Sequence, residues 1–186
     1  MNHRADVRLD LPDRLTVALE AGVRDVADFP RPGIVFKDIT PLLADPVGFA
    51  TVVEAFAALA RSTGASAVAG VEARGFVFAA PVATLTGLPF WPVRKAGKLP
   101  GAVLRREYAL EYGTAALELN AGVVSAGQRV LLIDDVLATG GTARAACELL
   151  EEAGAEVVAL AVLLELALLA GREQLGGRRV EALGTD

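Results

Sequence analysis

A chain of 186 residues with 53% hydrophobic and 22% charged side chains suits one compact domain and excludes a disordered protein. The formal net charge of −5 argues against a non-specific nucleic-acid binder, which normally carries a clustered basic surface. The single cysteine, Cys147, cannot form an internal disulfide, which favours a reducing cytoplasm. The apolar stretch from Val157 to Leu169 is interrupted by Glu165 and is shorter than the ~20 residues of a membrane span, so no membrane segment is expected.

The first half of the chain is expected to alternate between helices and buried strands. Asp10 is a typical N-cap residue and Pro12 is tolerated in a first turn, so a helix should begin there. In chain order, the expected elements are a helix to about Gly22, an ordered loop from Phe29 to Leu43, a helix from Asp45 to about Ser62, a strand from Ala67 to Val71, a helix from Gly75 to Thr86 and a strand from Leu88 to Val93.

The second half begins with a basic loop and continues with strands and one long helix. In chain order, the expected elements are a loop from Arg94 to Tyr108, a small hairpin between Leu104–Glu111 and Thr114–Leu119, a strand from Arg129 to Ile133, a helix from Gly141 to Ala153 and a strand from Glu156 to Leu164. Such alternation predicts a single α/β domain over residues 1–186, with a central, mainly parallel sheet flanked by helices.

The most informative segment is RVLLIDDVLATGGT, from Arg129 to Thr142. A buried strand runs through two adjacent carboxylates into a loop of small residues, and a helix follows. Unhindered backbone N–H groups and hydroxyls at a helix N-terminus suit a phosphate dianion. Acids beside a phosphate repel it unless a cation or sugar hydroxyls intervene, so Asp134 and Asp135 favour a sugar phosphate. The alternative is a strand end with solvated aspartates before an ordinary Gly-Gly turn.

The string IDDVLATGGT resembles the signature with which type I phosphoribosyltransferases bind phosphoribosyl pyrophosphate (PRPP). The resemblance implies that Asp134 and Asp135 bind the ribose diol, directly or through a hydrated Mg²⁺ that PRPP mainly holds. It also implies that the following loop binds the 5-phosphate of the sugar. The implied loop residues are Ala138, Thr139, Gly140, Gly141 and Thr142.

The segment FPRPGIVFKDITPLL, residues 29–43, resembles the base-binding hood of the family members that act on adenine. The resemblance implies that the purine stacks on Phe36, while backbone groups of Val35 and Lys37 read its amino edge. Aromatic stacking and fixed backbone donors and acceptors can discriminate an exocyclic group. Many members carry Arg where this chain has Lys37. The alternative is a proline-stiffened loop with a core phenylalanine.

The segment GVEARGFVFAAPVA, from Gly70 to Ala83, resembles the pyrophosphate loop of the same family. Glu72, Ala73 and Arg74 are thereby implied in PRPP binding, with a non-proline cis peptide between Glu72 and Ala73. Arg74 is suited to binding pyrophosphate in a bidentate manner. The alternative is an Arg-Gly turn in which Arg74 forms a surface salt bridge.

The segments RKAGKLPG and LEYG resemble the flexible catalytic loop of the family, residues 95–108 and the glutamate after them. The resemblance implies that Arg94 binds PRPP, that Lys95, Lys98 and Arg74 stabilise the departing pyrophosphate, and that Glu111 acts on N7 of adenine. Alternatively, the basic run is solvated surface and Glu111 lies exposed on a hairpin.

Together these resemblances imply a pentosyltransferase of purine salvage, a cytoplasmic glycosyltransferase homodimer that converts adenine and PRPP to AMP and pyrophosphate with Mg²⁺. Neither a nucleic acid nor a membrane is an expected partner. Two rivals stay open: an enzyme for the 6-oxopurines hypoxanthine, guanine or xanthine, and a PRPP-sensing regulator without catalysis. The C-terminal RRVEALGTD departs from the aromatic-containing tail common in the family.

Overall fold

The computed structural model describes residues 10–109 and 113–186. The chain divides into two compact units, Met1–Ala55 and Phe56–Asp186. The boundary falls within one helix, α3 (Pro46–Ser62), whose start after Asp45 and whose end agree with the sequence expectation. No helix in the described ranges is both long enough and apolar enough to cross a membrane.

The first unit begins with α1 (Leu11–Gly22), which starts and ends where the sequence predicts. The Asp10 carboxylate caps this helix by accepting a hydrogen bond of 3.1 Å from the Asp13 N–H. Helix α1 packs against a short helix, α2 (Thr40–Ala44), at Gly22. A Cβ on Gly22 would lie 2.7 Å from Leu42 Cβ, so the helices approach closely because Gly22 has no side chain.

The prediction of a loop over residues 29–43 is wrong for its second half. Strand β2 (Val35–Asp38) pairs antiparallel with β1 (Arg24–Ala27), and α2 follows at once. Four-residue strands are too short to show alternation in the sequence, so their pairing is decided by tertiary contacts. Asp38 accepts a hydrogen bond of 2.9 Å from the Thr40 N–H, which fixes the exit from β2. Hydrogen bonds from Thr40 and the ion pair with Arg24 also lower the pKa of Asp38 to about 2.

The described part of the second unit is built on a seven-stranded sheet. Its strands are β3 (Ala67–Val71), β4 (Phe90–Lys95), β5 (Val103–Ala109), β6 (Thr114–Asn120), β7 (Arg129–Leu137), β8 (Glu156–Glu165) and β9 (Val180–Thr185). The spatial order is β5-β6-β4-β3-β7-β8-β9, and all neighbours from β4 to β9 are parallel. Strand β6 pairs antiparallel with both β4 and β5. The expected mainly parallel sheet is therefore confirmed.

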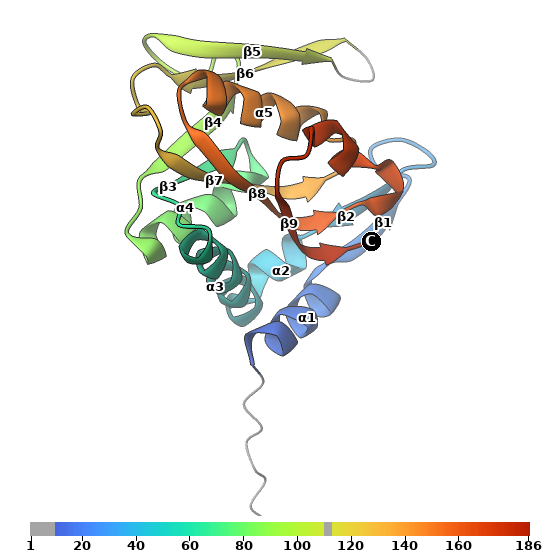
Figure 1. The fold of residues 1–186 in the computed structure, drawn as a ribbon. Helices are drawn as coiled ribbons and strands as arrows, with labels where there is room; N and C mark the ends of the chain where they lie inside the picture. The colour runs from blue at the N-terminus through green and yellow to red at the C-terminus, as the bar shows by residue number, and fades with distance from the viewer. Residues whose placement is uncertain (1–9, 110–112) are drawn as a thin grey trace, which may run out of the picture. The chain divides into compact units, whose positions relative to one another are not determined.

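Helices cover the two faces of this sheet. Helix α4 (Arg74–Thr86) packs on β3 and β7, and a Cβ on Gly70 of β3 would lie 2.7 Å from Ala79 Cβ of α4. Helix α5 (Gly141–Glu152) packs on β5, β6 and β8, and its buried side chains join the main apolar core with those of the sheet. Figure 1 shows α5 lying along the β5–β6 hairpin.

The order of the strands places a crevice between β3 and β7. From β3 the chain passes through α4 to β4 on one side, and from β7 it passes through α5 to β8 on the other. The carboxyl ends of two such strands, where the connections diverge, form the usual ligand crevice of a parallel α/β sheet. Gly70 of β3 and Ile133 of β7 form the last pair of this register, so Val71 and Asp134 follow directly after it on the two strands.

The expected loop from Arg94 to Tyr108 is shorter in the structure. Strand β4 continues to Lys95, and β5 begins at Val103 and pairs with β6 as the expected hairpin. Side chains hold the residues between the strands at three backbone positions. The Gly97 N–H donates to Glu118 Oε2 at 2.8 Å, Arg94 donates to the Lys98 carbonyl at 3.0 Å, and Asn120 donates to the Pro100 carbonyl at 2.9 Å.

The C-terminal segment forms part of the sheet. After β8, two short 3₁₀ helices, Ala167–Leu169 and Gly171–Leu175, lead to β9, which pairs parallel to β8. Strand β8 contains the expected strand from Glu156 to Leu164. Strand β9 was not predicted, because a six-residue edge strand without strong alternation carries no clear sequence signal.

Candidate active site

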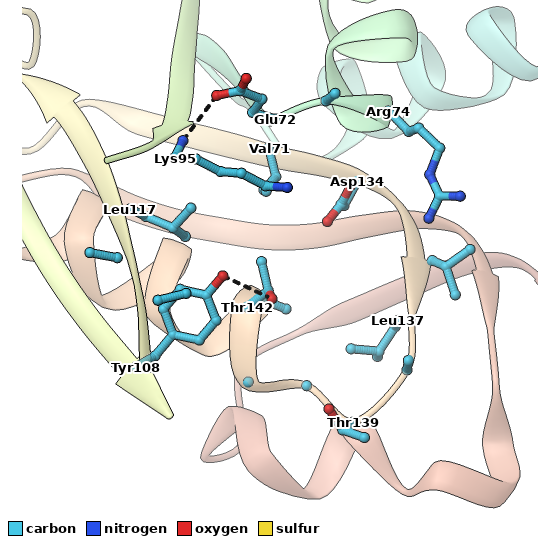
Figure 2. A pocket seen from close by; sticks show the side chains of 18 of the residues that line it. Val71, Glu72, Arg74, Lys95, Tyr108, Leu117, Asp134, Leu137, Thr139 and Thr142 are labelled. Atoms are coloured by element: carbon cyan, nitrogen blue, oxygen red, sulfur yellow. Dashed lines mark hydrogen bonds between the residues drawn. The ribbon is translucent and has the colours of Figure 1, made fainter. Parts of the chain in front are cut away.

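A cavity of about 850 Å³ opens at the carboxyl ends of β3 and β7 within the second unit. The hairpin β5–β6 and the turn before α5 complete its wall. Figure 2 shows Arg74, Lys95, Tyr108, Asp134 and Thr142 around this space. The acid pair, the phosphate loop and the pyrophosphate loop singled out in the sequence therefore line one cavity.

The acid pair lies on the last residues of β7, which continues four residues beyond its expected end at Ile133, to Leu137. Because the strand persists, Asp134 and Asp135 face opposite sides, as expected. Asp134 is half-buried, and desolvation together with the charge of Asp135 raises its pKa well above the ordinary value. Asp134 therefore resists ionisation unless a ligand supplies hydrogen bonds or positive charge.

Asp135 is buried, and its negative charge is balanced by Arg74 of the pyrophosphate loop. Its Oδ2 atom lies 2.6 Å from Arg74 Nε, although within the described residues no hydrogen bond of regular geometry reaches that oxygen. The close approach of the first turn of α4 to β7 depends on Gly75, where a Cβ would lie 2.6 Å from the Ile133 carbonyl oxygen. Arg74 keeps 43% of its side chain exposed and lines the cavity, so its remaining donors can meet an anion.

The loop from Ala138 to Thr142 joins β7 to α5 and turns sharply at Gly140, which has φ of +85°. No side-chain hydrogen bond caps this end of α5 among the residues described, so its first N–H groups are available to an anion. The 3₁₀ segment supports the turn from behind: a Cβ on Gly171 would collide with the Ala138 carbonyl oxygen.

Two contributors were not anticipated from the sequence. Gly171 allows the close backbone approach just described, and a lone glycine between short helices gives no signal of that kind. Tyr108 on β5 lines the cavity, and its phenolic oxygen accepts a hydrogen bond of 3.4 Å from Thr142 Oγ1 (Figure 2). The sequence placed Tyr108 only at the end of the basic loop and gave it no role of its own.

The pyrophosphate loop has the expected backbone, because the peptide between Glu72 and Ala73 is cis. The Glu72 carboxylate accepts hydrogen bonds from the Arg94 guanidinium at 3.1 and 3.2 Å and from the Lys95 N–H at 3.0 Å. These bonds, led by that from Arg94, lower the pKa of Glu72. Glu72 and Arg94 thus neutralise each other, and this pairing orients the Lys95 backbone at the cavity wall.

The cationic residues of the basic loop occupy different places. Lys95 lines the cavity, and Figure 2 shows its side chain extending into it. Lys98 is exposed and is absent from the cavity lining, so the structure does not bring it together with Arg74 and Lys95. Glu111, the expected catalytic glutamate, lies outside the described residues.

The expected adenine-binding residues belong to the first unit. Phe36 packs edge-to-face on Phe29, with ring centroids 5.1 Å apart. Val35 is exposed on β2, and Lys37 forms an ion pair of 2.7 Å with Asp25 of the adjacent strand. The Lys37 side chain is thus committed to Asp25, which leaves its main chain as the part suited to reading a base.

The donor set of the cavity fits Mg²⁺ only in company with a phosphate ligand. Across residues 10–109 and 113–186, no cluster of three or more His, Cys, Asp or Glu side chains could hold a metal ion. Mg²⁺ commonly retains waters and binds one or two carboxylates together with substrate phosphates. Asp134 and Asp135 supply that number of carboxylates, so they fit an ion that arrives with its ligand.

Asp134→Asn should stabilise the ligand-free protein at neutral pH. A raised carboxyl pKa means that the folded state binds its proton more tightly than the unfolded state, so stability falls as pH rises from the ordinary value of 3.8 toward the raised pKa. Asn carries no charge and keeps an oxygen for the Asp135 N–H, which donates to Asp134 Oδ1 at 2.9 Å. Denaturant titrations should show a larger gain at about pH 7.5 than at about pH 4.5. Equal stabilities at both values would contradict the expectation.

Residues 42–175 match the family model of the phosphoribosyl transferase domain. An adenine phosphoribosyltransferase of Kineococcus radiotolerans is 75% identical over 180 residues, which is 96% of this chain and 97% of that protein. The solved adenine phosphoribosyltransferase of Thermoanaerobacter pseudethanolicus has a TM-score of 0.87 at 42% identity, covering 94% of this chain and 99% of that one. The Saccharomyces cerevisiae enzyme, solved with an imino-altritol bisphosphate and adenine, has a TM-score of 0.85 at 34% identity, covering 93% and 98%.

A mainly parallel sheet with a phosphate loop and an acid pair at its switch point, matched by the phosphoribosyl transferase model, defines the type I phosphoribosyltransferase fold. The named relatives then show which family of this fold the chain is most similar to. The chain belongs to the adenine phosphoribosyltransferase family.

Proposed function

We propose that this chain transfers the phosphoribosyl group of PRPP to N9 of adenine, releasing AMP and pyrophosphate in purine salvage. The main observation that supports this proposal is that one cavity is lined by three features suited to binding anions and sugars: the uncapped loop before α5, the acid pair of β7 and Arg74. The relatives of the chain are named adenine phosphoribosyltransferase, and the yeast enzyme was solved in complex with an imino-altritol bisphosphate and adenine.

Each part of the cavity has a distinct task in this proposal. The N–H groups from Ala138 to Thr142 bind the 5-phosphate, which anchors the sugar at the N-terminus of α5. Asp134 and Asp135 accept hydrogen bonds from the ribose diol. Binding would thus draw Asp134 toward its ionised form, because hydrogen bonds to a carboxylate lower its pKa.

The opposite wall handles the leaving group. The bond from the anomeric carbon to pyrophosphate weakens early, so negative charge grows on the pyrophosphate oxygens, and fixed donors there lower the barrier. Arg74 and Lys95 line the cavity and supply this charge. Glu72 acts mainly by holding Arg94 and the Lys95 backbone in place. Mg²⁺ bound to PRPP, with water-mediated contacts to the acid pair, would neutralise further charge.

Adenine is assigned to Phe36 and to the backbone of Val35 and Lys37, with Glu111 hydrogen-bonding N7 so that N9 becomes the nucleophile. The edge-to-face packing of Phe29 on Phe36 supports this assignment, because it fixes the orientation of the Phe36 ring. The hood at residues 29–43 and the loop at residues 95–108 are proposed as parts of one catalytic domain. A cytoplasmic homodimer remains part of the proposal.

An assay with four bases tests the function. With PRPP and Mg²⁺, adenine should be consumed at least about a hundredfold more efficiently than hypoxanthine, guanine or xanthine, because a 6-oxo group mismatches donors placed for an amino group. Release of pyrophosphate and formation of AMP are measured together. Preference for a 6-oxopurine would replace adenine in the proposal, and PRPP binding without turnover of any base would indicate a regulator.

A further inference from the structure

Strand β5 lies along α5 with one face, and this contact runs from the first turn of the helix to its last. Leu104 and Tyr108 of that face pack against the main apolar core, to which α5 contributes. Between them, Arg106 donates to Glu148 Oε2 at 2.7 and 3.0 Å and approaches Glu152 at 3.7 Å. The hairpin is therefore docked on the same helix whose N-terminus forms the phosphate loop.

The contact nearest the phosphate loop differs from the others, because it joins two hydroxyl groups. Thr142 Oγ1 donates to the Tyr108 phenolic oxygen at 3.4 Å, a long and weak hydrogen bond. Thr142 is also a residue of the loop proposed to bind the 5-phosphate. Its single proton can serve either the Tyr108 oxygen or a phosphate oxygen, whereas the Tyr108 hydroxyl can donate as well as accept.

We propose that Tyr108 is a positioning residue that couples the β5–β6 hairpin to occupancy of the phosphate loop. This inference rests on the proposed function, which places the 5-phosphate at Thr142. When phosphate binds, the Thr142 hydroxyl donates to the anion, and the Tyr108 hydroxyl donates to Thr142 Oγ1. A donor chain that ends on an ionised acceptor is stronger than an isolated hydroxyl contact, because each bond polarises the next. Phosphate binding thus tightens the docking of the hairpin.

Thermodynamic linkage makes the coupling between phosphate binding and hairpin docking reciprocal. If bound phosphate strengthens hairpin docking by some factor, hairpin docking strengthens phosphate binding by the same factor. Tyr108→Phe keeps the ring in the core and removes only the hydroxyl, which isolates this contact from packing.

The test uses the full chain and ribose 5-phosphate, with calorimetry for affinity and amide hydrogen exchange for residues 103–109 and 114–120. In the unaltered protein, ribose 5-phosphate should protect both the phosphate loop and the hairpin. In Tyr108→Phe, the affinity should fall by about two- to tenfold, the scale of one hydrogen bond, and the added protection of the hairpin should shrink by the same factor. Thr142→Ser, which keeps a hydroxyl, should retain the coupling.

Arg106→Gln is the matched control, because Arg106 docks the same strand on the same helix but lies outside the cavity lining. It should raise hairpin exchange equally with and without ribose 5-phosphate and leave the affinity unchanged. The inference is overturned if Tyr108→Phe behaves like Arg106→Gln, or if the phosphate loop is protected while the hairpin never responds. If ribose 5-phosphate fails to protect even the loop, both this inference and the phosphate assignment of the proposed function are wrong.

Discussion

Replacing Asp134 and Asp135 together with Asn should reduce kcat/KM for PRPP by at least about a hundredfold, because hydrogen bonds to charged groups contribute about 1.5–3 kcal/mol each. Both residues line the cavity at the end of β7, where the ribose diol is proposed to bind. The amide oxygens can still accept hydrogen bonds but carry no charge for the diol or for hydrated Mg²⁺. Steady-state kinetics over a range of Mg²⁺ concentrations, with PRPP binding measured separately, check the result.

The pattern of losses distinguishes this role from a structural one. Asp134→Asn alone should lose PRPP affinity even though it gains stability at neutral pH, because the carboxylate that weakens the free fold is the one the ligand uses. Glu156→Gln provides a control, since it removes an exposed carboxylate that forms an ion pair with the surface Arg129 in β7 and lies outside the cavity lining. That variant should leave PRPP kinetics unchanged. Retained PRPP affinity in the double variant would disprove the ribose assignment.

Gly140→Ala should disable the phosphate loop, with an expected loss of about a hundredfold in kcat/KM for PRPP, the cost of misplacing a binding group by about 1 Å. Gly140 has φ of +85°, and a Cβ there would collide with the Gly171 carbonyl oxygen. The collision partner is backbone, so the loop itself must shift, and its N–H groups then miss the phosphate. Kinetics and ribose 5-phosphate affinity measure the effect.

Gly122→Ala separates collision from backbone strain. Gly122 has φ of +81°, but a Cβ there meets nothing within 4 Å. This variant should lose about 1–2 kcal/mol of stability through the left-handed backbone alone and keep an unchanged KM. Should Gly140→Ala resemble Gly122→Ala in both stability and KM, the close contact between the loop and Gly171 has no functional weight.

Long periodic elements and motif-bearing segments were predictable from the sequence. Strand Ala67–Val71 was placed at its observed ends, and α1 and α3 end at the expected Gly22 and Ser62. Their signals are local, because a buried run, a capping residue and a proline in the first turn act within a few residues. The phosphate loop was equally readable, since it needs consecutive small residues directly after a strand.

The pairing of short strands, and contacts between residues far apart in the sequence, could not be predicted in the same way. Strands β1, β2 and β9 are too short or too irregular for a periodic signal. The hairpin of β5 and β6 was expected, but β5 occupies part of the segment that was also expected as a loop. The pairing of Glu72 with Arg94 was also hidden, because the two residues are 22 positions apart in the sequence.

The sequence by itself determined which functional segments the chain carries: a phosphate loop, two acids, an arginine turn and a basic loop. Each of these segments consists of residues that are neighbours in the sequence. Only the tertiary structure decided which of these share a cavity. Parallel pairing of β3 with β7 brings Arg74 to 2.6 Å from Asp135, and docking of β5 on α5 brings Tyr108 to Thr142. Lys98, equally basic in the sequence, remains exposed outside that lining. The physical reason is that local sequence sets a residue's chemistry, whereas strand order and register set its neighbours.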